Sequence, residues 1–238
     1  MLTIGLLGGM SWESSALYYR LVNELVRGRL GGLHSARCVM ASVDFAVIEH
    51  LQSTGQWDSA GALLAREALR LEAAGADFIV LCTNTMHKVA GSIEDAVQIP
   101  LLHLADVTAE AVLGTGLKTV GLLGTAFTME QPFYRDRIAA HGLEVLVPDA
   151  AGRHDVHRII YEELVVGVVT EVSRRVVAQV IESLQAMGAE GVILGCTEIE
   201  LLIDQASSPL PVFPTTRLHA EAAVELALKD VGAGSPQQ

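Results

Sequence analysis

The sequence predicts an α/β fold made of two similar lobes, each built around a parallel sheet. Short apolar runs of strand length alternate with segments of helical periodicity along the chain, and this alternation is typical of parallel α/β proteins. Related segments also recur at a nearly constant offset, which indicates a duplicated unit. We expect residues 1–98 with 208–238 to form the first lobe and residues 99–207 the second, with the active site in the cleft between them.

The elements of the first lobe follow in a regular order. Ser11 suits the N-cap of a helix after the first strand, and Glu13 suits its first turn. A second helix over residues 57–74 should stop at Gly75. The last residues, 232–238, are predicted to be disordered. Strands are expected at residues 3–9, 38–43, 78–82 and 100–104, and the first and third of them are expected to be buried.

The duplication is visible in two matched pairs of segments. Gly-Leu-Leu-Gly at residues 5–8 recurs 116 positions later at residues 121–124. The stretch that ends in Cys82 and Thr83 recurs as one that ends in Cys196 and Thr197, with the cysteines 114 positions apart. Two matches at nearly one offset are rare by chance, and the period is far too long for a solenoid.

Composition excludes several classes of protein. The 238 residues carry a net charge of −12 and no cluster of Lys and Arg, so we expect no nucleic-acid partner. No apolar run reaches the length of a membrane helix, and the N-terminal residues show no basic leader. Three scattered cysteines do not form a disulfide framework. We therefore expect a cytoplasmic protein without a membrane partner.

Four predicted strand ends share one chemistry. Each apolar strand gives way to small polar residues at a helix start, where free N–H groups bind carboxylates. In open parallel sheets, ligands bind at this edge. The four strand ends are residues 8–11, 82–85, 124–128 and 196–198.

The paired cysteines predict acid/base chemistry at carbon. If Cys82 and Cys196 face each other across a substrate, their sulfurs would be roughly 7 Å apart. One thiolate would remove a proton and the other thiol would return one to the opposite face, which inverts configuration. Because both cysteines precede a predicted helix, we expect the helix N-termini to favour the thiolate.

Other interpretations of these residues stay open. A zinc site of Cys82, His87 and Cys196 lacks a close-spaced ligand pair, so no metal is expected. His87 fits a satisfied core histidine or a proton shuttle. Glu198 fits either a helix N-terminus or an orienting group for Cys196. Lys88 is the one candidate for a pyridoxal Schiff base, and no cofactor is expected.

Four motifs resemble the aspartate/glutamate racemase family, in the right order and from about residue 3 to residue 226. The resemblance implies cofactor-independent racemisation of a small-molecule amino acid, two α/β lobes with the last segment returning to the first, and a homodimer. The motifs are residues 8–14 (GGMSWES), 81–88 (LCTNTMHK), 121–129 (GLLGTAFTM) and 194–199 (LGCTEI).

The resemblance also assigns roles to residues. It implies that Cys82 and Cys196 are the catalytic pair. Gln52 lies in a stretch similar to a substrate loop of the family, Thr125 stands at the matching strand end, and Glu198 follows the second Cys-Thr. The residues that would hold the substrate carboxylate and ammonium are Met10, Thr83, Asn84, Thr85 and Thr197.

Two departures from the family pattern bear on the substrate. Residues 46–48 and 164–166 contain no basic side chain, although relatives for acidic amino acids place cations there. The family's Phe-Asp-Thr-Thr reads Phe-Pro-Thr-Thr at residues 213–216. Local chemistry therefore favours neutral or broad substrates, unless residues 153–158 supply a charge. Rival functions are maleate isomerisation, hydantoin racemisation, arylmalonate decarboxylation, or non-catalytic binding of a small carboxylate.

Overall fold

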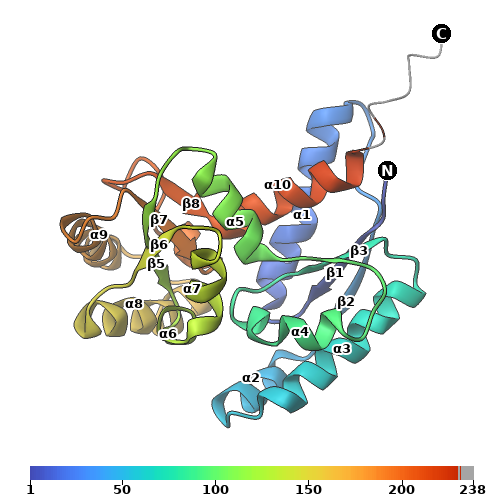
Figure 1. The fold of residues 1–238 in the computed structure, drawn as a ribbon, viewed down its shortest axis with the longest axis horizontal. Coiled ribbons are helices and arrows are strands. Elements are labelled where there is room, and N and C mark those ends of the chain that lie inside the picture. Colours follow the sequence, from blue (N-terminus) through green and yellow to red (C-terminus); the bar gives the residue numbers. More distant parts are fainter. Residues whose placement is uncertain (230, 232–238) are drawn as a thin grey trace. The chain divides into compact units, whose positions relative to one another are not determined.

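The structure, a computed structural model, describes residues 1–229 and 231. The chain divides into two compact units, Met1–His103 with His219–Gln238 and Leu104–Leu218. Within each, helices cover both faces of a four-stranded parallel sheet (Figure 1). The predicted α/β class with two similar sheets is confirmed. The tail predicted to be disordered, residues 232–238, lies outside the described residues.

The first sheet has the strand order β2-β1-β3-β4. All of its pairs are parallel, and β1 and β3 are the central strands. Three of its four strands span nearly the ranges predicted from the sequence, whereas β4 is shorter. The strands are β1 (Ile4–Gly8), β2 (Cys38–Ser42), β3 (Phe78–Leu81) and β4 (Leu101–Leu102).

Two helical layers sandwich this sheet. One buried cluster joins α1 and α10 to one face, and another joins α2, α3 and α4 to the other. Successive side chains at the end of β3 alternate between them: Val80 faces α1 and α10, Leu81 faces α3, and Cys82, directly after the strand, again faces α1 and α10. The helices are α1 (Trp12–Leu30), α2 (Phe45–Ser53), α3 (Trp57–Ala73), α4 (Ala90–Glu94), the 3₁₀ helix η1 (Thr85–Val89) and α10 (Thr215–Leu228).

The second sheet repeats the order of the first, β6-β5-β7-β8, again with parallel pairs. The duplication predicted from the sequence therefore extends to sheet topology. The strands are β5 (Thr119–Gly124), β6 (Glu144–Leu146), β7 (Gly191–Gly195) and β8 (Val212–Pro214). The helices are α5 (Leu104–Leu113), α6 (Ala126–Glu130), α7 (Pro132–Ala139), α8 (Ala150–Glu162) and α9 (Glu171–Ala186), with the 3₁₀ helices η2 (Leu164–Val166) and η3 (Ile199–Leu201).

The junctions between the units differ from the expected ranges of residues 1–98 with 208–238 and 99–207. β4 pairs with β3, which keeps residues up to His103 with the first sheet. β8 pairs with β7, which keeps residues 208–218 with the second. The return of the chain is made by α10, whose Ala220, Ala223 and Val224 pack in the first unit. These short edge strands follow loops, and only the pairing of the strands shows to which unit each loop belongs. The hydrophobic pattern of the sequence does not reveal this pairing.

Candidate active site

The first unit carries six of the expected site residues, five of them at the carboxyl ends of its central strands. Register pairs Leu7 of β1 with Leu81 of β3, so the segments after these strands are neighbours. α2 begins shortly after β2 and carries the buried side chain of Gln52. The six residues are Met10 after β1, Gln52 on α2, and Cys82, Thr83, Asn84 and Thr85 after β3.

Glycine at position 9 is required by the turn that follows β1. Gly9 adopts a φ of 95°, in the region that favours glycine. A Cβ there would collide with the backbone of Val43. The Gly9 N–H donates to Ser15 Oγ at 2.8 Å, and Ser11 caps α1 by accepting from the N–H of Ser14. The predicted N-cap at Ser11 is confirmed, and the turn holds Met10 at the sheet edge.

The thiol of Cys82 lies in an apolar environment. The residue is fully buried in the cluster that includes Tyr18 and Ala220. Its Sγ donates to the carbonyl oxygen of Val80 at 3.6 Å. Burial raises the pKa of this thiol far above its ordinary value. At rest, therefore, Cys82 is a neutral thiol.

The segment after Cys82 is a tight turn leading into a 3₁₀ helix. The Thr83 N–H donates to Leu81 O at 2.8 Å, and the His87 N–H donates to Asn84 O at 3.1 Å. The imidazole of His87 is buried, with Nδ1 2.7 Å from Thr83 O and its ring edge-to-face against His103. Because the carbonyl can only accept, Nδ1 carries the proton. His87 is thus a satisfied core histidine that holds the Thr83 turn.

In the second unit the edge after β5 and β7 carries the other four expected site residues. Register pairs Gly124 with Gly195, which brings Thr125 beside Cys196. The Thr125 hydroxyl lies 3.3 Å from that of Thr128. Thr197 and Glu198 follow directly after Cys196 and are partly exposed.

The Cys196 thiol has an ionisable partner. Its Sγ donates to Glu198 Oε2 at 2.9 Å. Burial raises the pKa of Cys196 well above its ordinary value, and the negative charge of Glu198 raises it further. This contact supports the interpretation of Glu198 as an orienting group for Cys196.

The expectation that helix N-termini would favour thiolates is wrong for this structure. Each cysteine is followed by a turn and a short 3₁₀ helix, η1 or η3, rather than by an α-helix. Burial dominates, and both thiols have raised pKa values. Cys38, at the start of β2, is partly exposed and is more accessible than either candidate thiol.

Sequence reasoning missed three polar residues beside Cys196. Thr215 donates to Leu194 O at 2.9 Å, and Thr216 donates to the Thr197 hydroxyl at 3.3 Å. Glu200 accepts the Thr216 N–H at 3.0 Å, and burial raises its pKa to about 7. The signal was the Phe-Pro-Thr-Thr stretch at residues 213–216, which only β8 pairing brings to the edge.

The cations upstream of η2 already have partners. Arg153 pairs with Glu130 at 3.0 Å and Arg158 with Glu163 at 3.0 Å. His157 accepts the Ala126 N–H on Nδ1, and burial lowers its pKa. The ammonium of Lys88, the Schiff-base candidate, lies 3.8 Å from the ring centroid of Trp57.

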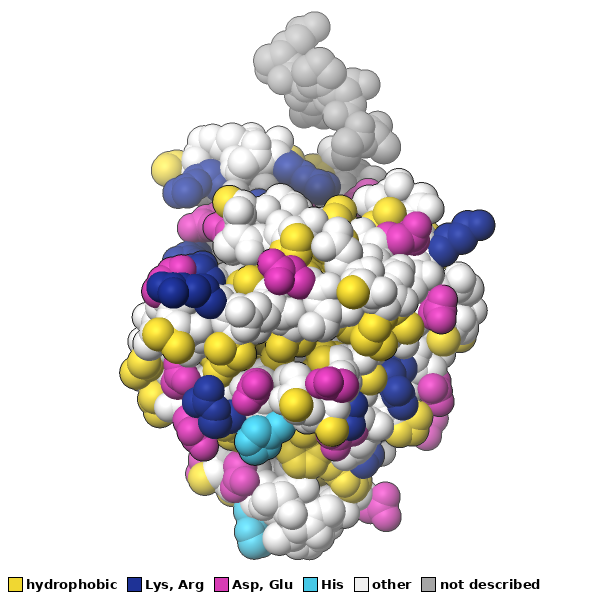
Figure 2. Space-filling model, turned by 90° about the vertical axis from the view of Figure 1, so that its left-hand side faces the viewer, with side chains coloured by type: hydrophobic (Ala, Val, Ile, Leu, Met, Phe, Trp, Pro, Cys, Tyr) yellow, Lys and Arg dark blue, Asp and Glu magenta, His cyan; other side chains and the backbone are white. Residues whose placement is uncertain are grey.

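Three further features concern metal binding, membranes and surface charge. Among the described residues, no group of three or more His, Cys, Asp and Glu side chains could hold a metal ion. No helix in residues 1–229 is long and apolar enough to cross a membrane. On the face that carries α8 and α9, acidic and basic side chains are interspersed rather than gathered into a basic field (Figure 2).

Comparison with known proteins identifies the family. Residues 7–223 match the sequence model of the Asp/Glu/Hydantoin racemase family. A crystal structure of a Yersinia pestis protein assigned to the Asp/Glu racemases is 52% identical, with a TM-score of 0.92 over 96% of this chain and 100% of that one. An aspartate racemase homologue from Pyrococcus horikoshii is 33% identical, with a TM-score of 0.85 over 95% and 99% of the two chains.

A characterised relative is more distant. The broad specificity amino-acid racemase RacX of Bacillus subtilis is 24% identical over 68% of this chain and 69% of its own length. The family model covers nearly all of the described residues, including both Cys-Thr strand ends. The chain therefore belongs to the Asp/Glu/Hydantoin racemase family, and this membership supports isomerase activity.

Proposed function

We propose that the protein is a pyridoxal-independent amino-acid racemase in which Cys82 and Cys196 form the acid/base pair. The proposal rests on the equivalent positions of the two cysteines in the two sheets. Each cysteine follows the third strand of a sheet, and the two sheets have the same strand order. Each is also followed by threonine.

The proposed reaction moves one proton off Cα and another onto its opposite face. The sulfur of one cysteine, as thiolate, takes the α-proton, and the electron pair delocalises into the substrate carboxylate. The other cysteine, as thiol, then donates its proton to the opposite face of the carbanion. For one enantiomer Cys196 is the base, for the other Cys82 is. The separation of roughly 7 Å between the sulfurs stays a prediction.

Because both thiols are protonated at rest, the base must first be ionised. For Cys196 the acceptor in the structure is Glu198, whose carboxylate accepts the thiol hydrogen bond. Proton transfer along this bond yields a thiolate beside a neutral carboxyl, which removes the adjacent negative charge. We propose that the ammonium of the bound substrate adds to this by favouring thiolate in both sites.

Substrate would be held by the polar strand ends. In this proposal the hydroxyls and amide of the residues after β3, β5 and β7 bind the α-carboxylate and ammonium, with Met10 and Gln52 shaping the site. The lack of cations at residues 46–48 and 164–166 supports neutral or broad substrates. The broad specificity of RacX, a distant relative, points the same way. The proposed binding residues are Met10, Gln52, Thr83, Asn84, Thr85, Thr125, Thr197 and Glu198.

The oligomeric state, the location and the cofactor requirement of the enzyme are also open to proposal. We propose a homodimer that acts in the cytoplasm on free amino acids and needs neither metal nor organic cofactor. Sedimentation velocity of the purified protein checks the dimer. Activity that survives chelator dialysis, in a protein without a pyridoxal absorbance band, checks the cofactor proposal.

The decisive experiment is hydrogen exchange. Incubation with single L-amino acids in D₂O, followed by NMR and chiral chromatography, should show loss of the α-proton signal together with appearance of the D-enantiomer. If no amino acid and no hydantoin exchanges its α-hydrogen, the result would contradict racemisation and favour a protein that only binds carboxylates. Release of CO₂ from an arylmalonate, or conversion of maleate to fumarate, would favour the corresponding carbanion enzyme.

A further inference from the structure

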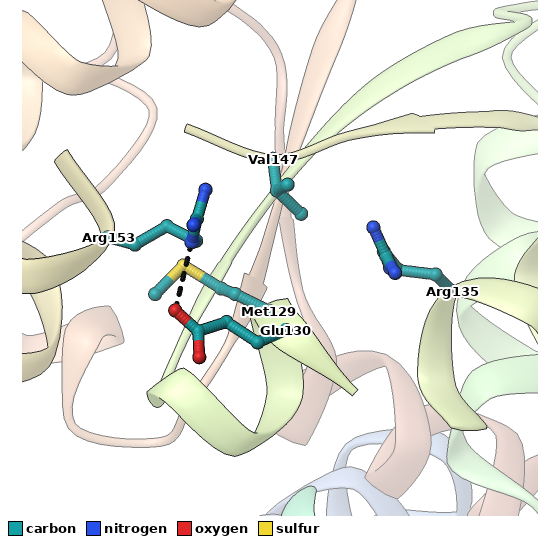
Figure 3. A pocket seen from close by; sticks show the side chains of 5 residues that line it. All are labelled: Met129, Glu130, Arg135, Val147 and Arg153. Carbon is teal, nitrogen blue, oxygen red and sulfur yellow. Dashed lines mark hydrogen bonds and ion pairs between the residues drawn. The ribbon is translucent and has the colours of Figure 1, made fainter. Parts of the chain in front are cut away.

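A pocket in the second unit has two arginines among its lining residues, and none of the four strand-end residues proposed there for catalysis and substrate binding lines it. The cavity is about 350 Å³ in volume, at the lower end of the range for small-molecule sites. Its walls come from α6, α7, α8 and the segment after β6. The lining residues are Met129, Glu130, Arg135, Val147 and Arg153, drawn in Figure 3.

One of the two cations is already neutralised. Arg153 donates from Nε to Glu130 Oε1 at 3.0 Å and from a terminal nitrogen to Pro148 O at 2.7 Å. Figure 3 shows this ion pair on one side of the cavity and Arg135 on the other. Arg153 and Glu130 cancel in charge, so the lining keeps one net positive charge, that of Arg135.

Arg135 is the cation with unused hydrogen-bonding capacity. Its Nε is buried and has no hydrogen-bond partner, and its side chain forms no ion pair with the residues that the structure describes. A buried donor without a partner is unfavourable, and the same side chain belongs to a residue that lines the cavity. The protein as a whole carries a net charge of −12, so the positive lining is a local feature.

We propose that this pocket binds a small carboxylate whose two oxygens pair with the guanidinium of Arg135. Arginine presents two parallel N–H donors that match a carboxylate. A lining with one net positive charge suits a monoanion better than a phosphate dianion. Met129 and Val147 give the cavity an apolar wall for a short hydrocarbon chain. Neither Cys196 nor Glu198 lines this pocket, and binding to it is measured independently of racemisation.

The test measures binding by calorimetry with butyrate as the probe and uncharged butyramide as its analogue. Wild-type protein should bind butyrate at least about tenfold more tightly than butyramide, and Arg135→Gln should lose at least about tenfold in butyrate affinity, because a hydrogen bond to a charged group is lost. Arg175→Gln is the matched control, since Arg175 is a largely exposed arginine on α9. It should bind butyrate as the wild type does.

Arg135→Lys keeps the test decisive if Arg135→Gln does not fold. Lysine retains the charge and loses the paired donors, so butyrate affinity should fall between those of the wild type and Arg135→Gln. Equal binding of butyrate and butyramide by the wild type would overturn the proposal. So would unchanged butyrate affinity in Arg135→Lys together with Arg135→Gln.

Two sources of the carboxylate are separated by kinetics. If the ligand is the side-chain carboxylate of an acidic substrate, kcat/KM of Arg135→Gln should fall at least tenfold for L-glutamate and stay unchanged for L-alanine. If the ligand is a free carboxylate, butyrate binding should be lost while kcat/KM for both substrates stays unchanged. An equal loss of kcat/KM for both substrates, with butyrate binding intact, would show a role without carboxylate recognition.

Discussion

The two thiols sit at equivalent places in a repeated sheet but in different chemical surroundings. Cys82 is followed by Thr-Asn-Thr-Met, and its Sγ contacts a backbone carbonyl inside an apolar cluster. Cys196 is followed by Thr-Glu-Ile-Glu, and its Sγ contacts the carboxylate of Glu198. Asn84 and Glu198 occupy matching positions two residues after the cysteines, and Met86 and Glu200 matching positions four residues after them.

This difference shows that the two units share the sheet and the cysteine but differ in the charge next to the cysteine. Two acid/base groups that serve opposite enantiomers need not be ionised by the same route. Because the equilibrium constant of racemisation is one, kcat/KM must be equal in the two directions whatever the asymmetry. The asymmetry therefore has to be sought in hydrogen exchange, in the pH dependence of each thiol and in stability.

The largest expected effect is the loss of either thiol. Cys82→Ala and Cys196→Ala should each lower racemisation by about 10²–10⁴-fold in both directions, because inversion needs both groups. Chiral chromatography starting from each enantiomer measures this. Cys38→Ala, which removes the partly exposed thiol of β2, should keep wild-type activity. More than half of the activity remaining in either candidate variant would refute the two-thiol mechanism.

Single-thiol variants also sharpen the comparison. In D₂O, Cys196→Ala should still exchange the α-proton of the enantiomer for which Cys82 is the base, and Cys82→Ala that of the other. Equal exchange of both enantiomers by one variant would show that its remaining cysteine does not act on a single face.

Replacing the acidic partner of Cys196 should have the next largest effect. Glu198→Gln removes the charge that raises the pKa of Cys196, so alkylation of Cys196 should begin at lower pH, while Cys82 is unaffected. Racemisation should fall about tenfold in both directions, because the proton acceptor is lost. Mass spectrometry of iodoacetamide-treated protein over a pH series reads each cysteine separately. Glu182→Gln, at an exposed position on α9, is the control, and a Cys196 profile identical to wild type would contradict the assignment.

The pH dependence of stability should reveal the raised pKa of Glu200 in the second unit. Burial raises the pKa of Glu200 from 4.5 to about 7, so the folded protein keeps a proton that the unfolded chain loses between these values. The contribution of Glu200 to stability is therefore full below pH 4.5 and lost as pH rises through 7. Relative to Glu200→Gln, wild-type protein should lose about 1–2 kcal/mol in unfolding free energy from pH 5.5 to pH 8. Urea unfolding at both pH values measures the difference, and a constant difference would show that Glu200 is ionised throughout.

The smallest expected effect concerns the hydroxyl link to Thr197. Thr216→Val removes the donor of the 3.3 Å hydrogen bond to Thr197 and should cost about 0.5–1.5 kcal/mol in unfolding free energy. Thr216→Ser keeps the hydroxyl and should recover much of that loss. If the serine variant is as unstable as the valine variant, the methyl group of this fully buried side chain contributes as much as its hydroxyl.

Much of the fold could be predicted because its signals are local. Short-range hydrophobic pattern and capping chemistry determine strand β1, the N-cap at Ser11 and the end of α3 before Gly75. The repeated topology was predictable because duplication leaves matched motifs. Assignment of β4 and β8 to their sheets was not, because two or three paired residues carry too little pattern to show which neighbour they join.

The candidate site divides in the same way. By itself the sequence determined the two-sheet α/β class, the pair of cysteines and the polar residues beside them, since each of these depends on a local sequence pattern. Only the tertiary structure decided that both thiols have raised pKa values, that Glu198 contacts Cys196, and that Glu200, Thr215 and Thr216 join the second site. Ionisation depends on burial and on neighbours distant in the chain, and those are set by packing rather than by the order of residues.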